Sequence, residues 1–490
     1  MLNKSVQIRM SEYKSIYDVV VDKGHFLRKV KEEIDFSFVN ELLKSSYCEN
    51  FGRPAKEPEM IFKILFLKKL YDFSDEVLVE QIKVNMAYKY FLDMLPEDEP
   101  VDSSLLTKFR KTRITQDMLE DMLKETIRQA IEKKLIKSTA IIVDATHSLA
   151  RFKHQSPTEI LRKLTKELRY QIYNTDYDLS AVFPDKPIMT AELDEEISYT
   201  RKLIEAVRTG VTKSYNKKAK ELFSKIEKML KDEKIREMQS ACDEEARTGH
   251  KSADDRFFGF KNHIAMTEER LITGLKITDG SVHDGKHLSD LVEQSRENGI
   301  AVTEVIGDTA YCTKDNLEAA SDKEAGFDLV SKLHPCVADA HTKERDGFTF
   351  NKDADTYACQ AGHIATVAKY HSKKNNNIVL TYHFSKVKCK KCPLQNQCKI
   401  SKKSRAFSVT IPKELFSERL KIQETEHFKT RYRQRYKIEA KNAEAKCYHG
   451  LGEADSKGIQ AMNIQSYFTA VVLNIKRILK LQTLKTETRG

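Results

Sequence analysis

The sequence predicts a mixed α/β protein whose central sheet is preceded by helices and interrupted by two insertions. Short β-branched runs alternate with helical patterns between residues 138 and 333, which is typical of strands and helices that share one sheet. Only 17 Gly and 10 Pro occur among 490 residues, and this shortage favours long helices over a loop-rich β fold. At this length we expect two or more domains, or one domain with large insertions.

The charge balance favours a polyanionic partner. The net charge is +11, with 32% charged residues, and a basic surface attracts nucleic acid. The N-terminus lacks an apolar signal-peptide core, and no run approaches the ~18 apolar residues of a membrane span, so we expect a cytoplasmic protein with no membrane partner. Nine cysteines occur, and clustered cysteines in a reducing compartment point to metal rather than to disulfides.

Residues 1–135 predict a helical N-terminal domain. Apolar residues recur at helical spacing, and Ser74 is expected to cap the helix that follows it. The segment "LLTKFRKTRI" has one apolar face, while Arg110 and Lys111 lie on the other. Such a basic helix is a DNA-binding candidate. A solvated basic face is an equally good interpretation of this segment alone.

The sheet is expected to form from two separated parts of the chain. Residues 136–150 contain the first strand, which runs into Asp144. Residues 255–335 contain two strands joined by the turn "TEE", a helix, a strand ending at Asp308, and a further helix and strand. The intervening residues 151–254 are charged and helical, so we expect an inserted helical hairpin or coiled coil there.

Residues 336–424 form the second expected insertion, which contains most of the clustered cysteines. The spacing in "CKKCPLQNQC", with a further cysteine upstream, fits tetrahedral zinc. The expected ligands of a structural Zn²⁺ are Cys359, Cys389, Cys392 and Cys398. His363 is the substitute for the first of them, and the alternative is a set of reduced surface thiols.

The same insertion is strongly basic. Residues 386–405 hold eight Lys or Arg and no Asp or Glu, so Lys390 and Lys391 are expected to contact DNA phosphates. Residues 425–490 read as helices that complete the sheet domain.

The stretch "RYRQRYKIEAKNAEAKCYHG" keeps a carboxylate among cations. On a single helix at 100° per residue, four side chains fall within a stripe of about 60°. They are Tyr432, Arg435, Glu439 and Lys446. Glu444 would lie on another face as a solvated neighbour. Taken alone, Glu439 is most simply explained by an intrahelical ion pair, which contributes about 0.3–0.5 kcal/mol.

The strand-end aspartates change the interpretation of that glutamate. Asp144, Asp308 and Glu439 would form a site for Mg²⁺ or Mn²⁺, because hard divalent cations take oxygen ligands. Two-metal phosphoryl transfer also uses carboxylates that meet from separate elements. Arg435 and Lys446 would then hold phosphates, the arginine in a bidentate manner.

Several other polar side chains lie near the same strand ends. His147, His263 and His283 are each more readily explained by packing or hydrogen bonding than by metal or DNA contact. Asp279 and Asp284 sit in a turn, so we expect them to be structural or to support the site indirectly.

Four residues match the spacing Y-x2-R-x3-E-x6-K at every position: Tyr432, Arg435, Glu439 and Lys446. With this signature the sequence resembles the DDE transposases of bacterial insertion sequences. "IIVDATH" is similar to the family's first-aspartate strand, and "VIGDTAYCTKDN" to its second-aspartate segment. "GFKNHIAM" with "LITGLKITDGSVHDGKHL" resembles its central hairpin and helix. "GRPAKEPEMIFKILFLKKLYDFSDEVLVEQI" with "DSSLLTKFR" resembles its helical N-terminal domain.

The resemblance implies an RNase H-like mixed sheet core with a helical N-terminal DNA-binding domain, a helical insertion and a cysteine-containing insertion. It implies cleavage of the ends of an insertion sequence by water, then joining of the 3′-hydroxyl ends to target DNA. Asp144, Asp308 and Glu439 would be the catalytic, metal-binding acids. The implied partners are double-stranded DNA, as terminal repeats and target, and a second copy of the chain in a homodimer at the nucleoid.

Two alternatives stay open at this stage. The chain could be a non-catalytic DNA-binding regulator descended from a transposase, although all three acids are present. It could also be a metal-dependent DNA nuclease that cuts without joining. A tyrosine recombinase with Tyr432 as nucleophile is disfavoured, because the accompanying cluster of catalytic Arg and His residues is not apparent.

Overall fold

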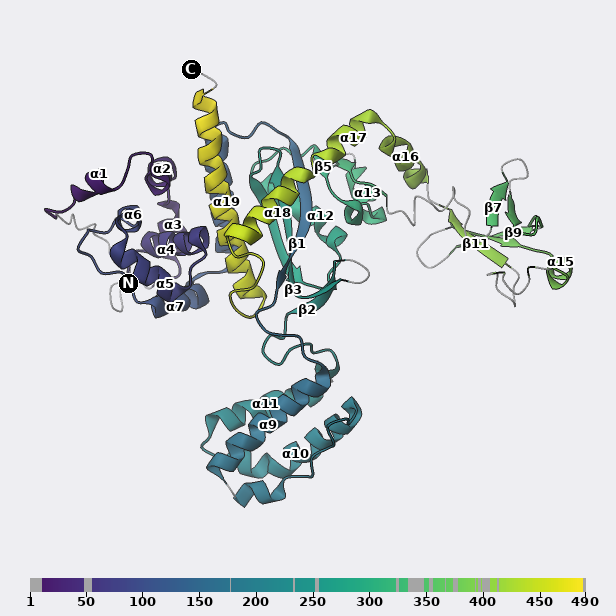
Figure 1. Ribbon diagram of the computed structural model, residues 1–490, viewed down its shortest axis with the longest axis horizontal. Coiled ribbons are helices and arrows are strands. Elements are labelled where there is room, and N and C mark those ends of the chain that lie inside the picture. The colour runs from purple at the N-terminus through teal and green to yellow at the C-terminus, as the bar shows by residue number, and fades with distance from the viewer. Residues whose placement is uncertain are drawn as a thin grey trace.

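The computed structural model describes residues 11–47, 55–176, 178–231, 234–251, 255–322, 326–333, 348–351, 356–365, 367–372, 378–392, 394, 398, 406–411 and 414–487. In Figure 1 the sheet lies in the middle of the molecule, with the N-terminal helices on one side and a small β-rich segment on the other. A helical bundle projects away from the sheet. The expected mixed α/β fold class is therefore confirmed.

The central sheet combines antiparallel and parallel strands. Its strands are β1 (Ala140–Leu149), β2 (Arg247–His250), β3 (Arg256–Thr267), β4 (Ile272–Asp279), β5 (Glu304–Ile306) and β6 (Asp328–Val330). Their order is β2-β3-β1-β5-β6, and β4 also pairs with β3. β1 runs antiparallel to β3 and parallel to β5, which is itself parallel to β6. β1 and β5 therefore carry their following residues toward the same edge of the sheet.

Apolar residues cover both faces of the sheet centre. Residues 141–143 of β1 are fully buried, the pattern of a strand packed on both sides. Helices α12 (Leu288–Glu297) and α19 (Ile459–Glu487) pack against β4. Asn474 of α19 donates to the Ile272 carbonyl oxygen over 2.9 Å and accepts from the Ile272 N–H over 2.7 Å. These two bonds tie α19 to the sheet backbone.

The expected N-terminal helices are present throughout the described part of residues 11–135. They are α1 (Ile16–Val20), α2 (Phe26–Glu33), α3 (Phe38–Lys44), α4 (Pro58–Tyr71), α5 (Asp75–Val84), α6 (Met86–Phe91), α7 (Ser103–Arg113) and α8 (Gln116–Glu132). Ser74 caps α5 as expected, because its Oγ accepts from the Val77 N–H over 3.2 Å. These helices share one hydrophobic core with the sheet. Across that core the rings of Phe62 and Phe468 lie 5.1 Å apart.

The helical insertion is a three-helix bundle, so the expected hairpin or coiled coil was wrong in detail. It consists of α9 (Pro157–Thr175), η1 (Asp178–Val182), α10 (Leu193–Lys213), α11 (Lys217–Lys231) and η2 (Lys234–Arg236). The three long helices pack on one another around a hydrophobic core separate from that of the sheet. Each helix has an apolar face, and the third helix covers the apolar surface that a pair would leave exposed.

The cysteine-containing segment forms two small sheets. Its elements are β7 (Phe348–Asn351), β8 (Thr356–Cys359), β9 (Val367–Ser372), β10 (Ile378–His383), α15 (Lys386–Lys390) and β11 (Ala406–Ile411). β7 pairs with β8, and β10 lies between β9 and β11. A small core joins the two sheets through Phe348, Tyr357, Ala365, Tyr382 and Phe384.

Short turns and helices complete the chain around the sheet. They are η3 (Asp284–His287), η4 (Thr309–Tyr311), α13 (Lys314–Ala320), α16 (Glu414–Gln423), α17 (Glu426–Arg433) and α18 (Tyr436–Tyr448). No helix among the described residues is long and apolar enough to span a lipid bilayer.

The stretch 431–450 forms two helices rather than the single helix expected. α17 ends at Arg433, the chain turns through Gln434 and Arg435, and α18 begins at Tyr436. α17 packs against β6 whereas α18 packs against β1, so the change of direction lets each helix reach its own strand. Tyr432 therefore belongs to a different helix from the other three residues of the stripe.

Glu444 is a scaffold residue, and the expectation that it is solvated was wrong. It accepts from Lys441 over 3.0 Å and from Lys476 of α19 over 2.6 Å. Although burial opposes it, bonding and charge from these two lysines lower the pKa of Glu444 to about 2. The pair joins α18 to α19.

Candidate active site

Asp144 lies within β1, and Asp308 follows the neighbouring parallel strand β5 and caps η4. β1 and β5 pair with Ile142 opposite Ile306, and each aspartate follows two positions later. Because side chains alternate along a strand with a period of two, each aspartate continues the face of its isoleucine. The structure thus brings the two acids close together. Asp308 follows the end of β5 as expected, but the expectation that the first strand ends at Asp144 was wrong, because pairing with β3 extends β1 to Leu149.

Burial and mutual repulsion make this carboxylate pair electrostatically unfavourable. Burial raises the pKa of Asp144 to about 7, with the negative charge of Asp308 as the next cause and Arg435 opposing. Burial also raises the pKa of Asp308, against the Ala310 N–H that donates to its Oδ1 over 2.9 Å. A nearby positive charge would relieve both effects.

Arg435 connects the three predicted acids. Its guanidinium interacts electrostatically with Asp144 and Asp308, and its Nη2 lies 3.5 Å from the Glu439 carboxylate. The guanidinium carbon lies 5.4 Å from the centre of the Tyr432 ring, and Nη1 donates to the Tyr432 hydroxyl over 3.3 Å. Arg435 is thereby held in place by an aromatic ring while facing the acids.

Glu439 lies on the helix that packs against β1, but it is the most open of the three acids. Its side chain is 59% exposed, and its observed ion pair is the intrahelical one with Arg435. On α18, Glu439 and Lys446 lie on the same face as Arg435 at 100° per residue. Lys446 is half-buried and interacts with Asp144, and burial followed by repulsion from Lys251 lowers its pKa.

The turns η3 and η4 support the aspartates from the opposite side. Asn316 donates to the carbonyl oxygens of Gly285 and Tyr311 over 2.8 and 2.9 Å. Asp284 of η3 accepts from Lys261 over 2.7 Å and adds negative charge to the environment of both aspartates. Asp284 therefore influences the pKa of both aspartates, an effect that its position in a turn of the sequence did not reveal.

The remaining polar residues near the strand ends have structural partners. The ring of His147 lies 4.8 Å from that of Phe257, and burial, then Lys446, lowers its pKa to about 4. His263 is buried and bonds Thr278 over 3.0 Å.

Two more of these residues shape local turns. His283 accepts from the Gly285 N–H over 3.2 Å and lies near Asp308. Asp279 accepts from the Ser281 N–H over 2.8 Å. Both contacts agree with the structural interpretation of these residues.

Sequence reasoning missed Asn442 and Tyr311. Asn442 of α18 donates to Oδ2 of Asp144 over 3.0 Å. At three residues after Glu439 it falls on the same helical stripe, so the periodicity of α18 could have revealed it. Tyr311 is fully buried and interacts with both aspartates, but no sequence pattern distinguishes it from a core tyrosine.

The donor set fits a hard divalent cation and a phosphate. Two partly buried carboxylates with raised pKa favour a cation, and the buried Oδ1 of Asn442 has no hydrogen-bond partner among the described residues. The buried Nε of Arg435 likewise lacks an acceptor there, and a free guanidinium donor suits a phosphate oxygen. Oxygen acceptors and nitrogen donors thus converge on one place.

Comparison with known families identifies two matched segments. Residues 15–112 match a transposase domain of the DUF772 type, and residues 358–479 match a transposase DDE domain. These two matches support a DDE transposase of insertion sequences. The central mixed sheet is accordingly the RNase H-like core of this family. The DDE match contains Glu439 but begins after Asp308, so the placement of the two aspartates comes from the fold.

One curated relative is a partial match. It is the uncharacterized protein ORF8 in the nfe locus of Rhizobium meliloti, 26% identical over 117 residues. The match covers 24% of this chain and 56% of the relative, so only about half the length of that relative is shared. No solved structure matches the chain.

Of the basic residues expected to contact DNA, one is engaged in an ion pair and three are exposed. Arg110 is engaged by Asp75, and its Nη1 donates to Oδ1 of that residue over 3.0 Å, so it holds α7 against α5. Lys111 is exposed on α7, and Lys390 and Lys391 are exposed at the end of α15. Part of the basic stretch 386–405 lies outside the described residues.

Three of the four expected zinc ligands pack against one small core. Cys359, Cys389 and Cys398 contact the core of the β7–β11 segment, and Cys392 lies two residues after the end of α15. All four are partly buried, and none forms a disulfide. Among the described residues, however, the sulfurs do not form a set with ligand atoms within 4.8 Å of one another. The side chains as placed therefore do not close a zinc site.

A different acidic group lies at the other end of β5 and β6. Ligand atoms of Glu304, Asp328 and His427 lie within 4.8 Å of one another. Glu304 is already engaged by Arg431, whose Nε donates to its carboxylate over 2.9 Å. Exposed acidic groups of this kind are common without a metal, and we assign no chemistry to this one.

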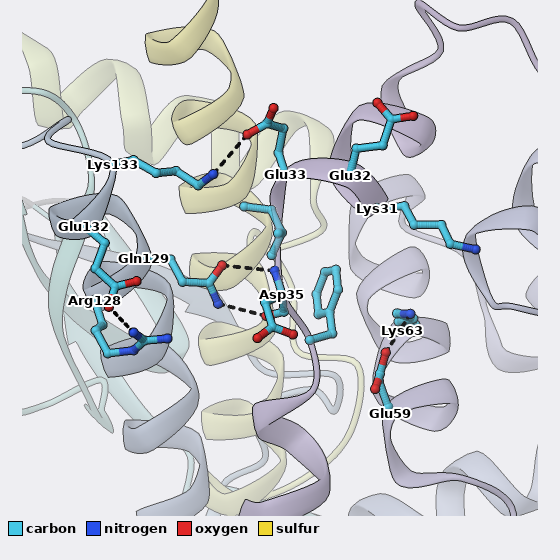
Figure 2. A pocket seen from close by; sticks show the side chains of 12 residues that line it. Lys31, Glu32, Glu33, Asp35, Glu59, Lys63, Arg128, Gln129, Glu132 and Lys133 are labelled. Atoms are coloured by element: carbon cyan, nitrogen blue, oxygen red, sulfur yellow. Dashed lines mark hydrogen bonds and ion pairs between the residues drawn. The ribbon is translucent and has the colours of Figure 1, made fainter. Parts of the chain in front are cut away.

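A cavity of about 600 Å³ lies among the N-terminal helices and contains none of the predicted site residues. Figure 2 shows that charged side chains pair across or along its walls, as Lys133 does with Glu33 over 2.9 Å. Gln129 bonds the Asp35 backbone through both amide atoms, over 3.1 and 2.8 Å. Through these pairings the polar residues that line the cavity connect α8 to the segment after α2.

Proposed function

We propose that this protein is a DNA transposase that cleaves the ends of an insertion sequence and joins the 3′-hydroxyl ends to target DNA. The observation that carries the proposal is that Asp144 of β1 and Asp308, two residues after β5, interact electrostatically, while α18, which bears Glu439, packs against β1. The matches to the two transposase domains support it.

In this proposal the three acids share the work of holding divalent cations. Asp144 and Asp308 would bind Mg²⁺ or Mn²⁺ from the sheet, and Glu439 would approach from α18. When bound, the cations lower the pKa of the attacking water or 3′-hydroxyl and stabilise charge on the leaving oxygen. No covalent enzyme intermediate is required, so Tyr432 need not act as a nucleophile. Its role in this proposal is to orient Arg435.

The cations of α18 would position the DNA backbone. Arg435 would hold the scissile phosphate through its fixed guanidinium, and Lys446 a neighbouring phosphate. Lys111, Lys390 and Lys391 would contact phosphates farther from the reacting bond. Since two ends must be brought together, a homodimer acting on terminal repeats at the nucleoid is part of the proposal.

A structural Zn²⁺ in the cysteine segment is a separate part of the proposal. It would use Cys359, Cys389, Cys392 and Cys398, with His363 as substitute, and no reaction step depends on it. Purified protein should contain zinc near one atom per chain, and Cys389→Ser with Cys392→Ser should lose it. Absence of zinc from protein purified without chelators would contradict this part alone.

The test of the proposed reaction is cleavage and joining of labelled element-end DNA in Mg²⁺, with the wild type and Glu439→Gln. We expect the variant to lose both steps and to keep DNA binding, since a catalytic carboxylate contributes several orders of magnitude to rate. Cleavage without joining by the wild type would favour a nuclease. Binding without cleavage of authentic ends would favour a regulator.

A further inference from the structure

Asn442 stands out among the buried asparagines because only one half of its amide is satisfied. The side chain is buried, with 8% exposure. Its Nδ2 donates to Oδ2 of Asp144 over 3.0 Å, while its Oδ1 has no hydrogen-bond partner among the described residues. Leaving such an acceptor buried and unpaired destabilises the fold unless a ligand satisfies it.

Asparagines of the scaffold show what a purely structural amide looks like. Asn474 bonds the Ile272 backbone through both amide atoms. Asn262 donates to Ser148 over 2.9 Å and accepts from Ser466 over 2.6 Å. Asn442 alone of these three leaves its oxygen unsatisfied, and that oxygen belongs to the amide that touches the Asp144 carboxylate.

The position of Asn442 links two parts of the proposed site. It lies on α18 between Glu439 and Lys446, on the face toward β1. Its bond to Asp144 is a cross-connection between the helix bearing the third acid and the strand bearing the first. Because the amide of Asn442 donates to Oδ2 of Asp144, it fixes the orientation of the carboxylate and leaves Oδ1 available to another partner.

We propose that Asn442 is a positioning residue, which orients the Asp144 carboxylate for a divalent cation and leaves its own Oδ1 to accept from the hydration shell of that cation. The inference rests on the proposed function, since it assumes that Asp144 binds a cation. Residues that orient metal ligands typically change metal affinity or activity 10- to 100-fold when replaced.

The test measures Mn²⁺ affinity of the full-length chain by electron paramagnetic resonance, with and without element-end DNA. Asn442→Leu keeps the branching of the side chain and removes both polar atoms, although leucine is larger, and Asn442→Ala provides a second variant without added volume. We expect both to bind Mn²⁺ 10- to 100-fold more weakly than the wild type. They should also need correspondingly more Mn²⁺ for half-maximal cleavage, with DNA affinity retained.

Asn474→Ala is the matched control, because it removes a buried asparagine of the scaffold. It should lower the melting temperature and leave the Mn²⁺ affinity unchanged. Asn442 variants that bind Mn²⁺ as the wild type does, or that lose affinity only as far as Asn474→Ala does, would overturn the inference. A wild type that binds no Mn²⁺ and cuts no DNA would instead overturn the proposed function, and the inference with it.

Discussion

Residues of α18 divide between the proposed site and the scaffold. Asn442 donates to Asp144 of β1, and Glu439 pairs with Arg435 just before the helix, whereas Glu444 bonds Lys441 and Lys476 of α19. The division follows from the helical period, since the two groups lie on different faces. Substitutions in this helix can therefore separate chemistry from stability.

Glu444→Gln should destabilise the fold without changing the reaction mechanism. The pKa of Glu444 is about 2 in the fold, below its ordinary 4.5. Its contribution to the free energy of unfolding is thus present above pH 4.5 and lost as the pH falls toward 2. We expect a loss on the order of 3 kcal/mol near pH 7, because Lys441 stays buried without its partner.

Chemical denaturation at several pH values checks this expectation. The difference between wild type and Glu444→Gln should narrow steadily below pH 4.5. A difference that is the same at pH 7 and pH 3 would show that the ion pair does not set the stability.

At the scale of elements, the site depends on turns as much as on strands. Gly285 of η3 packs directly on the carbonyl oxygen of Ala310 in η4, and an added Cβ would overlap that oxygen. The Ala310 N–H of η4 in turn donates to the carboxylate of Asp308, which caps this turn. The close approach of the two turns therefore sets the position of the second aspartate.

Gly285→Ala should impair cleavage while leaving the helices intact. Overpacking of this kind costs about 1–3 kcal/mol and shifts the backbone, so we expect a lower melting temperature and slower cleavage, with DNA binding retained. Gly452→Ala is the control, since nothing lies within 4 Å of a Cβ added there. Equal cleavage rates for both variants would show that the η3–η4 contact does not position Asp308.

The helices and strands show which features of the fold the sequence patterns could predict. The β-branched runs before Asp144 and Asp308 predicted both strands, because buried parallel strands have an apolar composition. The pairing of β1 with β5 was beyond reach, since register between distant segments is decided by tertiary packing. The break between α17 and α18 was missed for a similar reason: each helix follows a different strand. The partners of Glu444 come from α19, which no local pattern of α18 reveals.

At the scale of the whole molecule, the positive net charge is consistent with the proposed DNA partner. The net charge is +11, and phosphate contacts make binding strongly dependent on salt. Figure 1 places the β7–β11 segment at one end of the molecule, away from the N-terminal helices. Exposed cations in both regions would therefore contact separate stretches of DNA.

Replacing both Lys390 and Lys391 by alanine should weaken DNA binding uniformly across sequences. We expect the slope of log affinity against log salt to fall by about 2, close to one unit per phosphate contact. The double variant Lys217→Ala, Lys220→Ala, on exposed positions of α11, is the control. An unchanged salt dependence in the variant that lacks Lys390 and Lys391 would show that α15 does not contact DNA.

The most direct test of the central claim maps the bound metal on the protein itself. Fe²⁺ replaces Mg²⁺ in the full-length chain on element-end DNA, and peroxide with ascorbate then generates hydroxyl radicals that cut the backbone near the metal. We expect cuts near residues 144, 308 and 439 together, all lost in Asp308→Asn. Cuts confined to the neighbourhood of Glu304, Asp328 and His427 would contradict the assignment of the three acids to one catalytic site.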